Sequence, residues 1–278
     1  MKRFASLVVT ALVVAGGSAF VLAGGASGAS TLPTLKLALT GTKGISVSGS
    51  EVSGAVNVVS TFTGKGQGQA ALIRVNPNVP VAQALAQGNQ AIQSHHGDLN
   101  VLTALGDALV FDAAAPGAAQ TVLTPGTWLA LNVSGNGNNP PKALFTVTQS
   151  SSPAALPTPG GTVKAIDFGF QGASKLHRGE LVRFENDGFL VHMILGVQVK
   201  SMALAAAVTT ALKAGKDNLA RRLSIGSANF AGQLSPGGLQ QETISAAPGV
   251  YVLACFMNTQ DGREHTQLGM VRTIQITK

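Results

Sequence analysis

The chain carries an internal repeat, and this repeat constrains its architecture more than any single motif does. Three pairs of segments match: 54–59 (GAVNVV) with 179–184 (GELVRF), 71–75 (ALIRV) with 195–199 (LGVQV), and 125–132 (PGTWLALN) with 248–255 (PGVYVLAC). The intervals between the last two pairs are nearly equal, 50 positions from Val75 to Pro125 and 49 from Val199 to Pro248. The sequence therefore predicts two copies of one unit.

A stretch rich in Ser, Pro and Gly, residues 149–161, lies between the copies and is typical of a linker. We therefore expect two tandem β-sandwich domains, at 30–148 and 162–278. Each copy also holds a helix-prone insertion, 81–93 in the first and 202–222 in the second. The second insertion predicts one amphipathic helix packed on its sandwich, because its apolar residues fall near helical spacing at Leu204, Val208, Leu212 and Leu219.

The composition agrees with a β-rich protein. Only 11% of the 278 residues are charged and 34 are glycine, and Thr, Val and Ser are frequent. The net charge of +7 is spread over both halves without a basic run or interleaved aromatic residues. This distribution gives no indication of nucleic-acid binding.

The N-terminus predicts export. Lys2 and Arg3 precede the apolar run 4–23, and the small residues 24–30 offer a cleavage site after Ala29. This pattern is typical of a secretory signal peptide at 1–29, with a retained membrane anchor as the alternative. We expect a mature chain that is secreted, periplasmic or held in the cell envelope, with no membrane span of its own.

The second copy places unusual side chains around its last two strands. Cys255, the only cysteine of the chain, ends the predicted strand 250–255, and His265 and Met270 follow in the loop before the strand 271–276. Upstream, His192 begins an apolar strand. A thiolate, imidazoles and a thioether form a donor set that suits copper, because soft sulfur and borderline nitrogen ligands favour it.

In their order along the chain, His192, Cys255, His265 and Met270 resemble the type 1 (blue) copper site of the cupredoxin family. The resemblance covers residues 160–278 and rests on the strand that begins Pro-Gly-x-Tyr and ends in cysteine, a histidine five residues before a methionine, and an earlier histidine after a strand that ends in Asn186. It implies an all-β fold of two tandem cupredoxin-like Greek-key β-sandwiches, each with an inserted helix. It also implies copper as the cofactor, these four residues as its ligands, and electron transfer with a redox partner protein that the sequence does not identify.

The first copy, a degenerate repeat at 30–150, is expected to be metal-free. Asn132 stands where the second copy has its cysteine, and the loop that follows contains neither histidine nor methionine. Within the second copy, nine residues separate Cys255 from His265, an interval longer than the two to four residues usual in the family. We therefore expect His265 to be held less firmly than His192.

Two other classes of function remain open. Each candidate ligand could be an ordinary core or loop residue, which would make the protein a metal-free binding or structural module of the cell envelope. Catalysis is less favoured. A multicopper oxidase needs paired His-x-His motifs, which the chain lacks, and a nucleophilic constellation of Cys255, His265 and Asp261 has no recognisable oxyanion loop. His95 and His96 are expected to mark a helix end rather than a site.

Overall fold

The computed structural model describes residues 32–278 apart from 65–67, 84, 87–89, 91–97, 104–105, 108–116 and 134–139. The predicted signal peptide, His95 and His96 lie outside the described residues, and the predicted helix at 81–93 is described only in part.

The described part of the first half contains eight strands, one short 3-10 helix and helical residues at 81–83, 85–86 and 90. The elements are β1 (Thr34–Thr40), β2 (Gly44–Gly49), β3 (Gly54–Thr63), β4 (Ala70–Val75), η1 (Leu99–Leu102), β5 (Gly106–Asp107), β6 (Gly117–Leu123), β7 (Gly126–Asn132) and β8 (Lys142–Val147). Strand β1 illustrates the local pattern, because Leu35, Leu37 and Leu39 are buried while the residues between them face solvent. Alternation of this kind produces a sheet with one face turned to a core.

The second half adds nine strands and two helices. They are β9 (Gly161–Ile166), β10 (Gly169–Gly172), β11 (Lys175–His177), β12 (Leu181–Asn186), β13 (His192–Val199), α2 (Met202–Lys213), α3 (Asp217–Leu223), β14 (Gly226–Leu234), β15 (Leu239–Thr243), β16 (Gly249–Ala254) and β17 (Val271–Thr277). Strand β13 is buried along almost its whole length, and β14 and β16 pair with its two edges.

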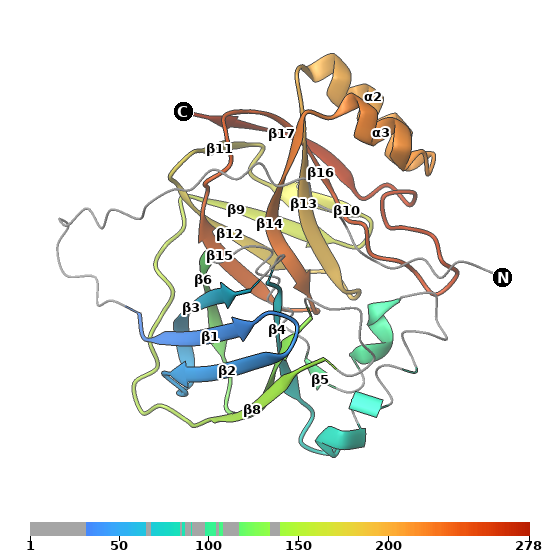
Figure 1. Ribbon diagram of the computed structural model, residues 1–278. Coiled ribbons are helices and arrows are strands. Elements are labelled where there is room, and N and C mark those ends of the chain that lie inside the picture. The colour runs from blue at the N-terminus through green and yellow to red at the C-terminus, as the bar shows by residue number, and fades with distance from the viewer. Residues whose placement is uncertain are drawn as a thin grey trace.

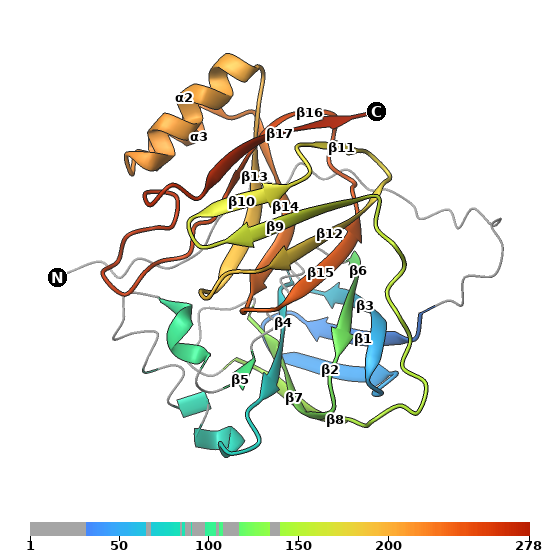
Figure 2. The same ribbon diagram turned by 180° about the vertical axis from the view of Figure 1, so that it is seen from behind.

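The strands form three sheets. The largest has the order β10-β9-β12-β15-β6-β3-β1-β2 and so contains strands of both halves, as Figures 1 and 2 show. The other two, β11-β17-β16-β13-β14 and β5-β4-β7-β8, each belong to one half. The two halves share one strand order. Within the large sheet, the first strand of each half runs parallel to the third strand that this half contributes, β1 to β3 and β9 to β12.

The halves meet in this large sheet rather than only through the linker. Gln241 of β15 pairs with Gln120 of β6, and the two side chains also bond, with Nε2 of Gln241 donating to Oε1 of Gln120 at 3.0 Å. Thr121 adds a hydrogen bond from its hydroxyl to the carbonyl of Leu239 at 2.8 Å. Pairing covers what would otherwise be two open sheet edges. The sequence predicted two tandem sandwiches and left open whether they associate.

Each half has its own core between two sheets. In the second half, the core joins β9, β10 and β12 on one side to β13, β14, β16 and β17 on the other, and it includes Phe184, Phe230 and Tyr251. In the first half, Trp128 of β7 is buried among residues of β1 and β3. The candidate site lies at the end of the second core.

The helical insertion of the second half differs from the single helix predicted for 202–222. Helix α2 ends at Lys213 and α3 begins at Asp217, because Gly215 adopts a left-handed conformation (φ 64°) that stops the first helix. Val208 and Leu212 are buried against the sheet as expected, whereas Leu219 is exposed. Helix α2 packs on β16 and β17, and α3 packs against α2 (Figure 1). No helix in the described part of the chain is long and apolar enough to cross a membrane.

Candidate metal centre

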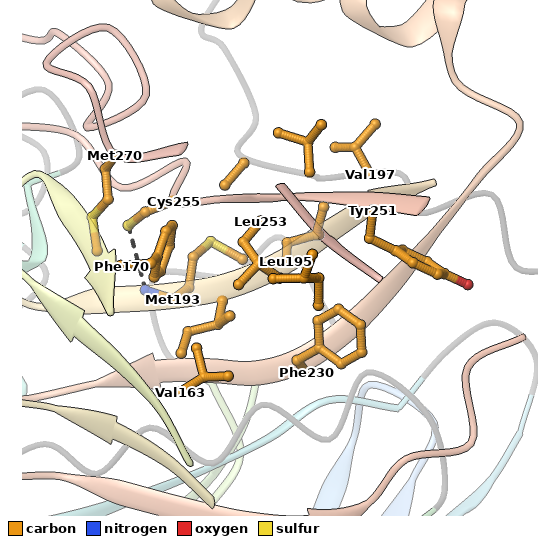
Figure 3. Packing of buried hydrophobic residues seen from close by; sticks show 14 of the residues in the cluster. Val163, Phe170, Met193, Leu195, Val197, Phe230, Tyr251, Leu253, Cys255 and Met270 are labelled. Atoms are coloured by element: carbon orange, nitrogen blue, oxygen red, sulfur yellow. Dashed lines mark hydrogen bonds between the residues drawn. The ribbon is translucent and has the colours of Figure 1, made fainter. Parts of the chain in front are cut away.

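Two neighbouring strands bring the first two candidate ligands together. His192 is the first residue of β13, and Cys255 follows the last residue of β16, which pairs with β13 in antiparallel register. Because β13 is a central strand and β16 lies beside it, both side chains reach the site from rigid backbone. The backbone amide of Met193 donates a hydrogen bond to Sγ of Cys255 at 3.4 Å, drawn as a dashed line in Figure 3.

His265 completes a cluster of three donor atoms. Its Nδ1 lies 3.1 Å from Nδ1 of His192 and 3.5 Å from Sγ of Cys255, and the third separation, from Sγ of Cys255 to Nδ1 of His192, is 3.8 Å. All three residues are fully buried. This group could hold a metal ion, since every donor atom lies within 4.8 Å of the others.

The loop that carries His265 is held by its own backbone. The amide of His265 donates to the carbonyl of Met257 at 2.9 Å, and the amide of Thr266 donates to the carbonyl of Cys255 at 3.1 Å. The carbonyl of His265 accepts from the amide of Met270 at 3.0 Å. The backbone of His265 is therefore held in place despite the nine-residue interval, and the weaker orientation of its ring relative to His192 stays a prediction. The additional residues form a loop whose two ends are joined by an antiparallel β-bridge between Asn258 and Glu264.

Met270 is buried beside the cluster. Its carbonyl accepts a hydrogen bond from the amide of Cys255 at 3.3 Å, and its side chain belongs to the same core. Figure 3 shows the Met270 side chain next to that of Cys255, close to Phe170. The thioether thus lies on the same side of the core as the thiol.

A carboxylate orients the first imidazole. Oδ1 of Asp167 lies 3.0 Å from Nε2 of His192. An ionised carboxylate only accepts hydrogen bonds, so Nε2 carries the proton and the lone pair of Nδ1 faces the cluster. The backbone amides of Phe189 and Leu190 also donate to this carboxylate, at 3.0–3.2 Å. Asp167 is therefore fixed by three partners.

Asn186 holds the loop between β12 and His192. Its amide nitrogen donates to the carbonyls of Leu190 and Leu234, and its Oδ1 accepts from the amide of Gly188. Gly188 leaves no room for a side chain. A Cβ there would lie 2.6 Å from Oδ1 of Asp167 and 2.9 Å from Nε2 of His192. Asp167 and His192 can approach each other only because residue 188 is glycine.

The second imidazole is covered by an aromatic ring. Phe168 meets His265 edge-on, with ring centroids 5.4 Å apart at 89°. Nε2 of His265 is buried and has no hydrogen-bond partner among the described residues. A buried nitrogen without a partner is rare in folded proteins.

Burial keeps the three groups uncharged. It raises the pKa of the Cys255 thiol to about 12, although the amides of Met193 and Met257 act in the opposite direction. It lowers the pKa of His265 to about 4, and the nearby His192 lowers it further. It also lowers the pKa of His192, against the effect of Asp167. The contact between Asp167 and His192 is therefore a hydrogen bond that the neutral imidazole donates to the carboxylate.

The first half supports the centre through η1. The amide of Val191, the residue before His192, donates to Oδ1 of Asn100 at 2.5 Å. Asn100 lies in η1 and is itself held by Asp98, which accepts from its backbone and side-chain nitrogens. Leu99 packs against the core of the second half. The β13 end that carries His192 is therefore supported from both halves.

The cluster fits a single transition-metal ion. First-row transition-metal ions lie about 2.0 Å from an imidazole nitrogen ligand and about 2.3 Å from a thiolate sulfur ligand. Donor atoms bound at these distances to one ion lie about 3–4 Å from each other. The observed separations of 3.1, 3.5 and 3.8 Å fall in this range. One soft thiolate with two imidazoles is a donor set typical of copper.

Sequence reasoning found the three clustered residues but missed their surroundings. Asp167, Phe168 and Gly188 lie in turns and show no motif, so no pattern in the sequence marks them as neighbours of the site. Asp261, considered as a partner for His265, instead bonds to Thr259 and Arg263 at the surface. The carboxylate that does reach an imidazole is that of Asp167.

No protein-family model matches the chain, and no curated protein matches it in sequence. Among solved structures, auracyanin B is 21% identical over 44% of this chain and 93% of its own, with a TM-score of 0.25. Reduced auracyanin from Roseiflexus castenholzii is 21% identical over 42% and 95%, with a TM-score of 0.26. A mutant of amicyanin in its Cu(I) form is 12% identical over 44% and 86%, with a TM-score of 0.25. These TM-scores are low, and the chemistry of the centre follows from its own atoms.

Proposed function

We propose that this protein binds one copper ion at Cys255, His192 and His265 and carries single electrons. The observation that supports this most strongly is the convergence of one thiol and two imidazole nitrogens in a fully buried group. In the proposal Met270 is a weak axial ligand. Copper so bound would accept and release one electron, and the axial donor would tune the potential.

The residues around the proposed copper ion hold its ligands in place and bury them from solvent. His192 and Cys255 are held by paired strands, and His265 is held by the backbone of its loop. Donor atoms that cannot move favour one geometry for both oxidation states, which suits electron transfer. The amide of Met193 donates to Sγ of Cys255, so it stabilises negative charge on this sulfur.

We also propose that both halves are cupredoxin-like sandwiches in tandem and that the first holds no metal. Their common strand order supports this, as does Asn132, which takes the place of the cysteine and whose side chain donates to the carbonyls of Gly41 and Gly44. Export by a signal peptide at 1–29 belongs to the same proposal. N-terminal sequencing of the secreted protein tests it, and residue 30 is the expected first residue.

A metal-free module is the second candidate, because the two Nδ1 atoms at 3.1 Å could share a proton in a hydrogen bond. The visible spectrum with stoichiometric Cu(II) separates the two. A copper centre with a thiolate ligand gives an intense charge-transfer band, and Cys255→Ser removes it while keeping the size of the side chain. A colourless protein that binds no copper favours the metal-free module.

A further inference from the structure

A turn of two residues lies between β9 and β10. Ile166 pairs with Gly169, so only Asp167 and Phe168 connect the strands. Phe168 has φ 60° and is the only non-glycine residue with positive φ in the described part of the chain. Glycine or asparagine adopts this conformation easily, whereas a bulky aromatic residue rarely does. Contacts elsewhere must hold Phe168 there, and such strain is typical of functional sites.

The first residue of the turn contacts one imidazole. Asp167 accepts from Nε2 of His192 and from the amides of Phe189 and Leu190. It therefore anchors both the His192 ring and the loop that precedes it. Without an acceptor at this position, the His192 ring could rotate or take its other tautomer.

The second residue contacts the other imidazole. The Phe168 ring stands perpendicular to that of His265. The Phe168 carbonyl lies close to Gly269 in the loop of His265, since a Cβ added to that glycine would be 3.6 Å from the carbonyl oxygen. Phe168 is 36% exposed and His265 is fully buried. Because Phe168 reaches solvent while the ring that it touches does not, it forms part of the cover over His265.

We propose that Asp167 and Phe168 form a clamp, in which one two-residue turn positions both imidazoles and shields His265 from solvent. Both are positioning residues, since neither is a ligand in the proposed centre. The purpose of the clamp, to position two copper ligands, rests on the proposed function. Its geometry exists in the copper-free protein and can be tested there.

The first experiment measures the modification of His265 by diethyl pyrocarbonate in the copper-free full chain, with the exposed His177 as internal reference. Peptide mass spectrometry gives the two rates. Phe168→Ala should raise the rate at His265 about tenfold, because opening the cover exposes Nε2. Phe168→Tyr retains an aromatic ring, so the rate of modification at His265 should stay as low as in the wild type.

Two further variants keep this test decisive. Phe168→Gly removes the ring but adopts φ 60° without strain, so it should fold well and still expose His265. Phe189→Ala is the matched control, because this side chain is 90% exposed in the adjacent loop and makes no ring contact with either histidine. An unchanged rate at His265 in both Phe168→Ala and Phe168→Gly would overturn the shielding role.

The second experiment loads the protein with Cu(II) and records its electron paramagnetic resonance spectrum. Asp167→Ala should change the hyperfine splitting, because His192 loses its orientation, and Asp167→Asn should restore most of it through its remaining acceptor oxygen. A spectrum unchanged in Asp167→Ala would overturn the role of Asp167. If the wild type binds no copper, the proposed function fails, while the modification rates still decide on the shield.

Discussion

The Nδ1 atoms of His192 and His265 lie 3.1 Å apart, although 73 positions separate the two residues in the chain. Both rings are fully buried, and Sγ of Cys255 lies within 3.8 Å of both nitrogens. Side chains that bring unprotonated nitrogens this close repel one another unless a proton or a cation lies between them.

Removing a ligand should have unequal effects. His192→Ala and Cys255→Ala are expected to abolish stoichiometric Cu(II) binding, because each removes a donor held by a paired strand. Met270→Leu should retain copper and raise the reduction potential, because a long, weak donor that favours Cu(II) is lost while the apolar volume remains. Metal analysis and voltammetry measure both effects. His177→Ala, an exposed histidine on β11, is the control and should change neither.

Copper binding should release one proton near neutral pH. The pKa of Cys255 is raised to about 12, so its thiol is protonated, whereas the lowered pKa values of His192 and His265 leave both rings neutral. Only the thiol must then lose a proton, and affinity should rise about tenfold per pH unit between about pH 7 and 9. Titration calorimetry in buffers of different ionisation enthalpy counts the protons. Release of none would exclude the thiolate, and release of two would mean that a histidine is protonated before binding.

The copper-free protein should lose stability in mild acid. The pKa of His265 falls from 6.5 to about 4 on folding, so the unfolded chain binds more protons between these values. The stabilisation is fully present above pH 6.5 and is lost as the pH falls to about 4, by about 3 kcal/mol. Glu242, whose pKa burial raises to about 8, acts in the opposite direction. The measurement is therefore the difference in urea denaturation between the wild type and His265→Gln, and an equal acid sensitivity of both would contradict it.

Gly188→Ala should disturb the centre without touching a ligand. The added Cβ would lie 2.6 Å from Oδ1 of Asp167 and 2.9 Å from Nε2 of His192, so the loop must move. We expect a loss of about 1–3 kcal/mol in stability together with weaker copper binding. Gly44→Ala is the matched control, since its Cβ would meet only Thr40 at an ordinary 3.7 Å. Equal stability and affinity in both variants would show that the Asp167 contact is dispensable.

The contact from the first half should stabilise the second. Asn100→Ala leaves the amide of Val191 without its acceptor and should lower stability by about 1 kcal/mol, and copper affinity should fall with it. Thr103→Ala in the same turn removes an exposed hydroxyl that bonds only locally, and should have little effect. Denaturation and copper titration of both variants give the comparison. Residues 160–278 expressed alone should then bind copper more weakly than the full chain, and equal affinity would argue against any support from the first half.

The sequence predicted the strands around the site well, because the position of a strand depends largely on local apolar patterns and turn residues. The strand that begins at His192, the strand that ends before Cys255 and the final strand all lie where apolar runs and turn residues indicated. The interruption between α2 and α3 was missed although Gly215 marks it, since one glycine inside a helical pattern does not always end the helix. The exposed position of Leu219 follows from that interruption.

The sequence by itself determined the strand pattern, the internal repeat and the identity of three chemically distinctive residues. Only the tertiary structure decided that His192, Cys255 and His265 meet, because their meeting depends on which strands pair and on how a long loop closes. It also decided the roles of Asp167 and Phe168, which an ordinary turn carries to two histidines far away in the chain. Contacts of this kind arise from packing between distant segments, and neither periodicity nor spacing records them.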